Sequence, residues 1–179
     1  MTEEIRRCEA ADATAAALAM AFISMDTMTF LSLPDGVEAQ GRTDFINWVD
    51  TYLKGHPDQP YKYRGIDVYG ARCAMLHSFG SATQFHDRNG EALVFGYHDG
   101  GQHMHNPEVD PRLVMIGSTS FLNDVVAALA AFMEACKSSP ELKARVEPRL
   151  ERVLAVVPLR TVGTVGTAAK GISLFGMKI

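Results

Sequence analysis

A helical repeat of apolar residues, uninterrupted by glycine or proline, constrains the fold of this chain more than any other feature. Between Glu3 and Leu33 the apolar side chains recur at steps of three and four residues: Ala15, Leu18, Ala19, Phe22, Ile23, Met25 and Phe30. This period is typical of an α-helix, and the many alanines and methionines favour the helical backbone. We therefore expect one long helix over residues 3–33, ended by Pro34-Asp35-Gly36.

Further segments repeat the helical spacing, so the chain is predicted to be mainly helical. A length of 179 residues suits a single domain, which we place at residues 1–158, followed by a Gly-rich C-terminal tail at 159–179. The expected helices are 44–53 after an N-cap at Thr43, 66–79, 121–136, and a last helix from Pro140 to about Ala155 that Ser139 caps.

The period changes between residues 81 and 118, where short β-rich segments replace the helical spacing. Asn89-Gly90 is a typical hairpin turn, with residues 82–85 before it and the apolar run 92–97 after it. Leu113-Val114-Met115-Ile116 is a further strand candidate. The sequence therefore predicts a small antiparallel insert of two or three strands in a helical bundle.

Charge and cysteine content exclude several classes of protein. The formal net charge is −4, from 17 basic and 21 acidic residues, which does not suit a binder of duplex DNA because such proteins present a strongly basic face. Cys8, Cys73 and Cys136 are far apart in the sequence, which argues against a disulfide framework and against a structural zinc site. We expect no cofactor.

The sequence also bears on location. The N-terminal residues include early acids and no apolar run before a cleavage site, so no signal peptide is predicted. The longest apolar stretch, residues 125–133, has about half the length that a bilayer span needs. We expect a cytoplasmic protein with no membrane partner.

Arg72 and His77 are the strongest candidates for catalytic residues. On the helix predicted over 66–79 they differ by about 7.5 Å of rise and about 140° of rotation, a separation that a long arginine side chain can bridge. Histidine exchanges protons near neutral pH, and arginine stabilises charge that develops on a phosphate. The two side chains are therefore a minimal set for metal-independent cleavage of RNA by its own 2′-hydroxyl.

This segment resembles the motif of the HEPN superfamily (higher eukaryotes and prokaryotes nucleotide-binding domain), in which a histidine follows an arginine after four to six residues. The resemblance covers roughly Glu3 to Cys136, and only Arg72 and His77 map onto the motif; Cys73 stands where the family often has a polar residue. It implies a HEPN-like helical bundle, RNA cleavage and a homodimer in which two copies of the motif meet. Asp67, Tyr69 and Cys73 are candidates for supporting roles.

Other side chains offer alternative chemistry. Cys73 and His77 lie on one helical face with Tyr69, so a cysteine–histidine nucleophilic pair is conceivable. His98, His103 and His105, with His86 nearby, are candidate ligands for zinc or nickel, although histidines in a polar loop are more often solvated. Tyr61 and Tyr63 could stack on a base or pack on the core.

Two functions follow from these observations. The first is a metal-independent endoribonuclease of HEPN type, acting as a homodimer on single-stranded RNA. The second is a non-catalytic helical module for dimeric interaction or nucleotide binding. An exposed His77 beside Arg72 would favour the first function, and an Arg72 buried in a salt bridge to Asp67 or Asp44 would favour the second.

Overall fold

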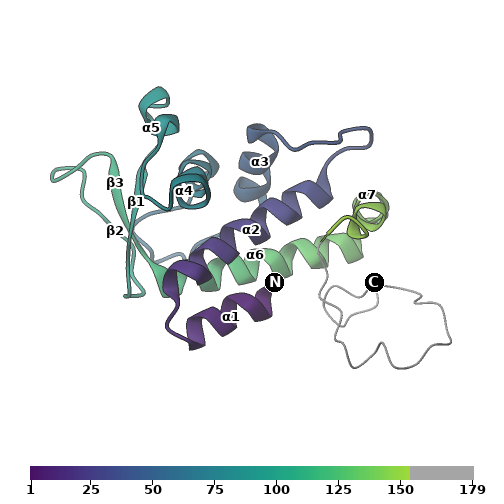
Figure 1. Ribbon diagram of the computed structural model, residues 1–179, viewed down its shortest axis with the longest axis horizontal. Helices are drawn as coiled ribbons and strands as arrows, with labels where there is room; N and C mark the ends of the chain where they lie inside the picture. Colours follow the sequence, from purple (N-terminus) through teal and green to yellow (C-terminus); the bar gives the residue numbers. More distant parts are fainter. Residues whose placement is uncertain (154–179) are drawn as a thin grey trace.

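The chain forms a helical bundle with a small sheet at one end (Figure 1). The structure is a computed structural model that describes residues 1–153, and the predicted tail at 159–179 lies outside the described residues. In chain order the described elements are α1 Thr2–Ala10, α2 Thr14–Ser32, α3 Arg42–Tyr52, α4 Gly65–Ser78, α5 Gln84–Arg88, β1 Val94–His98, β2 Met104–His105, β3 Leu113–Gly117, α6 Ser118–Ser138 and α7 Pro140–Leu150.

The two longest helices, α2 and α6, form the centre of the bundle. These two helices pack against each other, and α2 also contacts α1, α3 and α7. Figure 1 shows the sheet at the opposite end of the bundle from α7. The rings of Phe22 and Phe121 lie 5.4 Å apart in this core. Helices α2 and α6 are each long and apolar enough to cross a membrane. Core helices of soluble proteins also meet these two criteria of length and hydropathy.

The long helix predicted over residues 3–33 is wrong, because the chain breaks between α1 and α2. Asp12 adopts a left-handed backbone with φ 55°, a conformation that aspartate tolerates better than most residues. A continuous helix over 3–33 would extend about 46 Å. The break lets α1 return along α2 and bury Ile5 completely.

The three-stranded sheet is mixed, so the expected antiparallel arrangement is wrong for its main pair. β3 lies in the centre; it runs parallel to β1, with Phe95 opposite Val114, and antiparallel to the two-residue strand β2, with His105 opposite Val114. The segment between β1 and β3 carries β2 to the far side of β3, which is why β1 and β3 point in the same direction.

The predicted hairpin at Asn89-Gly90 is also wrong. The segment expected to be its first strand leads into helix α5, because the Thr83 hydroxyl caps that helix by accepting a hydrogen bond from the Phe85 N–H at 3.3 Å. The second strand is present as β1. The other predicted helices are present, although α7 ends at Leu150 and not near Ala155.

Candidate functional site

Helix α4 carries the candidate pair and is fixed between α3 and the sheet. Its first residue, Gly65, donates its N–H to Asp50 Oδ1 at 2.6 Å. A Cβ at Gly65 would lie 2.6 Å from the carbonyl oxygen of Ile46, so only glycine permits this approach of α4 to α3. Val68 and Ala71 are buried on the inner face of α4, whereas His77 in its last turn is exposed.

Arg72 and His77 are brought into contact on α4. Arg72 Nη1 lies 3.0 Å from His77 Nε2, so the long arginine side chain bridges the angular separation expected from the helix. Arginine can only donate, so in this contact Nε2 accepts and the neutral imidazole carries its proton on Nδ1. Nε2 is therefore in the form that a general base requires.

Asp26 on α2 anchors the guanidinium. Its Oδ2 accepts hydrogen bonds from Arg72 Nε at 2.8 Å and from Nη2 at 2.6 Å, and its Oδ1 accepts from Gln40 Nε2 at 2.8 Å. The two charged side chains are 18% and 19% exposed. Burial lowers the pKa of Arg72, but the hydrogen bonds to Asp26 and the negative charge of Asp26 raise it. The raising effects together outweigh burial, so the pKa of Arg72 lies above its usual value.

Sequence reasoning missed Asp26, because no spacing rule connects α2 with α4. The available signal was composition: Asp26 is the one charged residue between Thr14 and Ser32. A lone charge in an apolar helix usually has a partner. The partner of Arg72 is thus neither Asp67 nor Asp44; Asp44 accepts the N–H of Gly41 at the start of α3.

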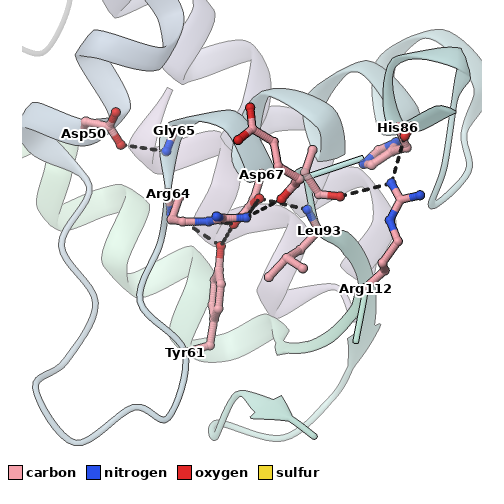
Figure 2. Close-up of polar contacts among 10 residues, drawn as sticks. Asp50, Tyr61, Arg64, Gly65, Asp67, His86, Leu93 and Arg112 are labelled. Carbon is pink, nitrogen blue, oxygen red and sulfur yellow. Dashed lines mark hydrogen bonds and ion pairs between the residues drawn. The ribbon is translucent and has the colours of Figure 1, made fainter. Parts of the chain in front are cut away.

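Asp67 lies in a separate cluster that joins the start of α4 to the sheet (Figure 2). Its fully buried carboxylate accepts four hydrogen bonds: from Tyr61 Oη at 2.8 Å, Arg64 Nε at 2.7 Å, Arg64 Nη2 at 2.6 Å and the Leu93 N–H at 2.9 Å. The carboxylate therefore holds the segment before α4 against the start of β1, and its role is to position α4.

The other two supporting candidates lie closer to the pair. Tyr69 is half-buried against Phe45 and Phe85, with ring centroids 5.8 Å and 5.1 Å away. Cys73 is half-buried, and its Sγ lies 4.0 Å from Arg72 Nη1. Within residues 1–153 no hydrogen bond joins Cys73 to His77, so the geometry offers no assembled cysteine–histidine pair.

Tyr61 and Tyr63 pack on the core and are not presented to a ligand. The Tyr61 side chain is buried against Phe95. The Tyr63 hydroxyl donates to Asp124 Oδ2 at 2.9 Å and lies 2.6 Å from His103 Nε2. Burial is the main cause that raises the pKa of both tyrosines and of Asp124. Tyr63 therefore links the loop before α4 to α6, and Tyr61 links it to β1.

The candidate metal ligands do not come together. His98 Nδ1 accepts from the Gly100 N–H at 3.0 Å, His103 is buried, and His105 Nε2 is buried with no hydrogen-bond partner among residues 1–153. His86 lies against Gly70 on α4. In the part of the chain that the structure describes, no group of three or more histidine, cysteine or acidic side chains is arranged to hold a metal ion.

His103 should make the stability of the fold depend on pH. Its Nδ1 accepts from the Gly117 N–H at 3.2 Å, so Nε2 carries the proton of the neutral ring. Burial, followed by the charges of His98 and Lys62, lowers the pKa of His103 to about 4. The unfolded chain, with an ordinary pKa of about 6.5, binds a proton that the folded state does not bind between these two values.

We therefore expect the contribution of His103 to the free energy of unfolding to be complete above about pH 6.5 and to be lost as the pH falls toward 4. The free energy of unfolding should change by about 3 kcal/mol over this range. Urea unfolding of wild type and His103→Gln at several pH values measures it. The variant should lack this part of the pH dependence; parallel curves for the two proteins would contradict the assignment.

Comparison of the chain with protein-family models, with curated proteins and with solved structures finds no match. The Arg72–His77 contact and its Asp26 anchor are therefore the observations from which a function is inferred.

Proposed function

We propose that this protein is a metal-independent endoribonuclease of HEPN type that cleaves single-stranded RNA as a homodimer. The observation that carries the proposal is the 3.0 Å contact between Arg72 Nη1 and His77 Nε2 at the exposed end of α4. An arginine held by Asp26 and a solvent-accessible imidazole supply a cation for a phosphate and a group that transfers a proton.

The proposed reaction uses the RNA as its own nucleophile. A phosphate oxygen accepts the hydrogen bond that Arg72 Nη1 otherwise donates to His77. His77 Nε2 is then free to accept the proton of the 2′-hydroxyl. The 2′-oxygen attacks the adjacent phosphorus and the bond from phosphorus to the 5′-oxygen breaks, which leaves a 2′,3′-cyclic phosphate. The leaving 5′-oxygen takes a proton from water to become a 5′-hydroxyl, and His77 returns the proton that it accepted to the solvent. Arg72 stabilises the charge on the phosphate oxygens in the transition state.

The homodimer is part of the proposal. The resemblance of the Arg72–His77 segment to the HEPN motif implies that two copies of the pair face one shared substrate channel. Ile23 supports an interface near the pair, because it lies one helical turn before Asp26 on α2 and is 40% exposed. An apolar side chain on this face is suited to contact with a second copy.

The direct test is incubation of the wild-type protein with labelled single-stranded RNA and with DNA of the same sequence. We expect the RNA to be cleaved to products that end in a cyclic phosphate, in EDTA as in its absence, because the proposed pair needs no metal. DNA should remain intact because it lacks the 2′-hydroxyl. Cleavage that stops in EDTA would contradict the proposal.

The second candidate function is a non-catalytic helical module for dimeric interaction or nucleotide binding. The observation that favours it is the Asp26–Arg72 ion pair, since a mostly buried arginine with a fixed carboxylate partner also serves to join α2 to α4. Absence of cleavage of any RNA by the wild-type protein would favour this module over the ribonuclease.

A further inference from the structure

Phe79 presents an aromatic ring to solvent directly after the helix that carries the candidate pair. Its side chain is 73% exposed. It follows α4 immediately and stands two residues after His77, so the two Cα atoms are at most about 7 Å apart. Among the phenylalanine, tyrosine and tryptophan residues of 1–153, Phe79 is the only one whose side chain is mostly exposed.

The backbone at Phe79 is unfavourable for this residue. Its φ of 49° and ψ of 40° lie in the left-handed region, which phenylalanine rarely adopts and for which glycine is suited. The Phe79 N–H donates to the Met75 carbonyl at 3.2 Å, and the Gly80 N–H donates to the Ala74 carbonyl at 3.1 Å. The ring is exposed, so the fold gains little from a phenylalanine here.

We propose that Phe79 stacks on a base of the RNA next to the phosphate held by Arg72 and His77, an inference that rests on the proposed function. Base stacking on an exposed aromatic ring is a general means of holding single strands, since every base has a π-face. Because Tyr61 and Tyr63 are engaged in the core, Phe79 is the aromatic residue near the pair that is free to contact a base.

The surroundings of Phe79 favour a base over a protein partner. Ser78, Gly80 and Ser81 are exposed beside it, so the ring is a single apolar group in a polar segment. A stable protein interface needs a contiguous surface of about 1,000 Å² or more with an apolar centre. A single base needs only one ring face.

The test compares RNA binding by His77→Ala with binding by the double variant His77→Ala, Phe79→Asn, so that cleavage does not interfere. The probe is a fluorescein-labelled single-stranded RNA of about 20 nucleotides in mixed sequence, longer than the site of a single binding fold. Asparagine tolerates the left-handed backbone, so the melting temperature should stay the same or rise. We expect the affinity to fall about 5- to 140-fold, and Phe79→Trp to retain it.

A second probe separates stacking from other contacts. The same RNA made with abasic sites offers no base to stack on, and there Phe79→Asn should have no effect. Equal affinities of the His77→Ala protein and the double variant for intact RNA would overturn the inference, while cleavage by the pair could still be found. A change of molecular mass in light scattering on Phe79→Asn, with unchanged RNA affinity, would instead assign Phe79 to an interface between copies.

Failure of the proposed function gives a different pattern. If wild type cleaves no RNA but binding still depends on Phe79, the stacking role stands and the ribonuclease proposal fails. If no RNA binds, both fail.

Discussion

His77→Ala is expected to lower the rate of RNA cleavage by about 10²- to 10⁴-fold, the contribution that a positioned general acid or base makes. Arg72→Ala should cause a loss of similar size, because the transition state would lose its cation. The measurement is the initial rate of cleavage of a labelled single-stranded RNA at saturating substrate. Binding should be weakened less by His77→Ala than by Arg72→Ala, since the imidazole acts on a proton and the guanidinium on the phosphate.

Matched controls test whether this loss is specific to Arg72 and His77. His56 is an exposed histidine in the loop after α3, so His56→Ala should cleave RNA as fast as wild type. Cys73→Ser should also matter little, since Cys73 has no hydrogen bond to His77 within residues 1–153. Loss of activity in Cys73→Ser with full activity in His77→Ala would refute the proposed pair and favour a cysteine nucleophile.

Asp67→Ala should destabilise the fold by about 3 kcal/mol, the lower end of the range for removing one partner of a buried ion pair. The Asp67 carboxylate accepts four hydrogen bonds and is fully buried. Its removal leaves the Tyr61 hydroxyl and the Leu93 N–H without their acceptor, whereas the half-exposed Arg64 can turn to water. Urea unfolding monitored by circular dichroism measures the change.

Two comparisons test the cause of that loss. Asp67→Asn keeps one acceptor oxygen, so it should cost less than Asp67→Ala. Asp58→Ala removes a carboxylate that is 91% exposed and pairs with the exposed His56, and it should change stability by no more than about 0.5 kcal/mol. A similar stability for Asp67→Ala and wild type would show that the cluster in Figure 2 does not hold the fold together.

The helices that have local signals were predictable from sequence. Ser139-Pro140 opens α7 as expected, since the Ser139 hydroxyl accepts from the Leu142 N–H at 3.2 Å, and α4 occupies residues close to those that the apolar spacing indicated. The break at Asp12 has no such signal. It depends on the packing of α1 along α2, which forms only when distant residues meet.

The sheet and the site show the same limit. Asn89-Gly90 is a local hairpin signal, but the cap at Thr83 and the position of β2 beside β3 override it. The meeting of Arg72 and His77 could be anticipated, because both lie on one helix. Asp26 could not be assigned to Arg72 from spacing, since the contact joins residues 46 apart in the sequence.

The two members of the candidate pair belong to parts of α4 that differ in their freedom to open. Arg72 is held in the middle of the helix by a carboxylate from the central bundle, so separating it from α2 requires breaking packed tertiary structure. His77 lies in the final turn, where the N–H groups of Phe79 and Gly80 cap the carbonyls of Met75 and Ala74 and the carbonyls that follow have no further helical partner. Local fraying of that turn costs far less free energy than global unfolding. The imidazole is therefore freer to move than the guanidinium, and in the proposed reaction this movement would admit a strand of RNA between them while the rest of the fold stays intact.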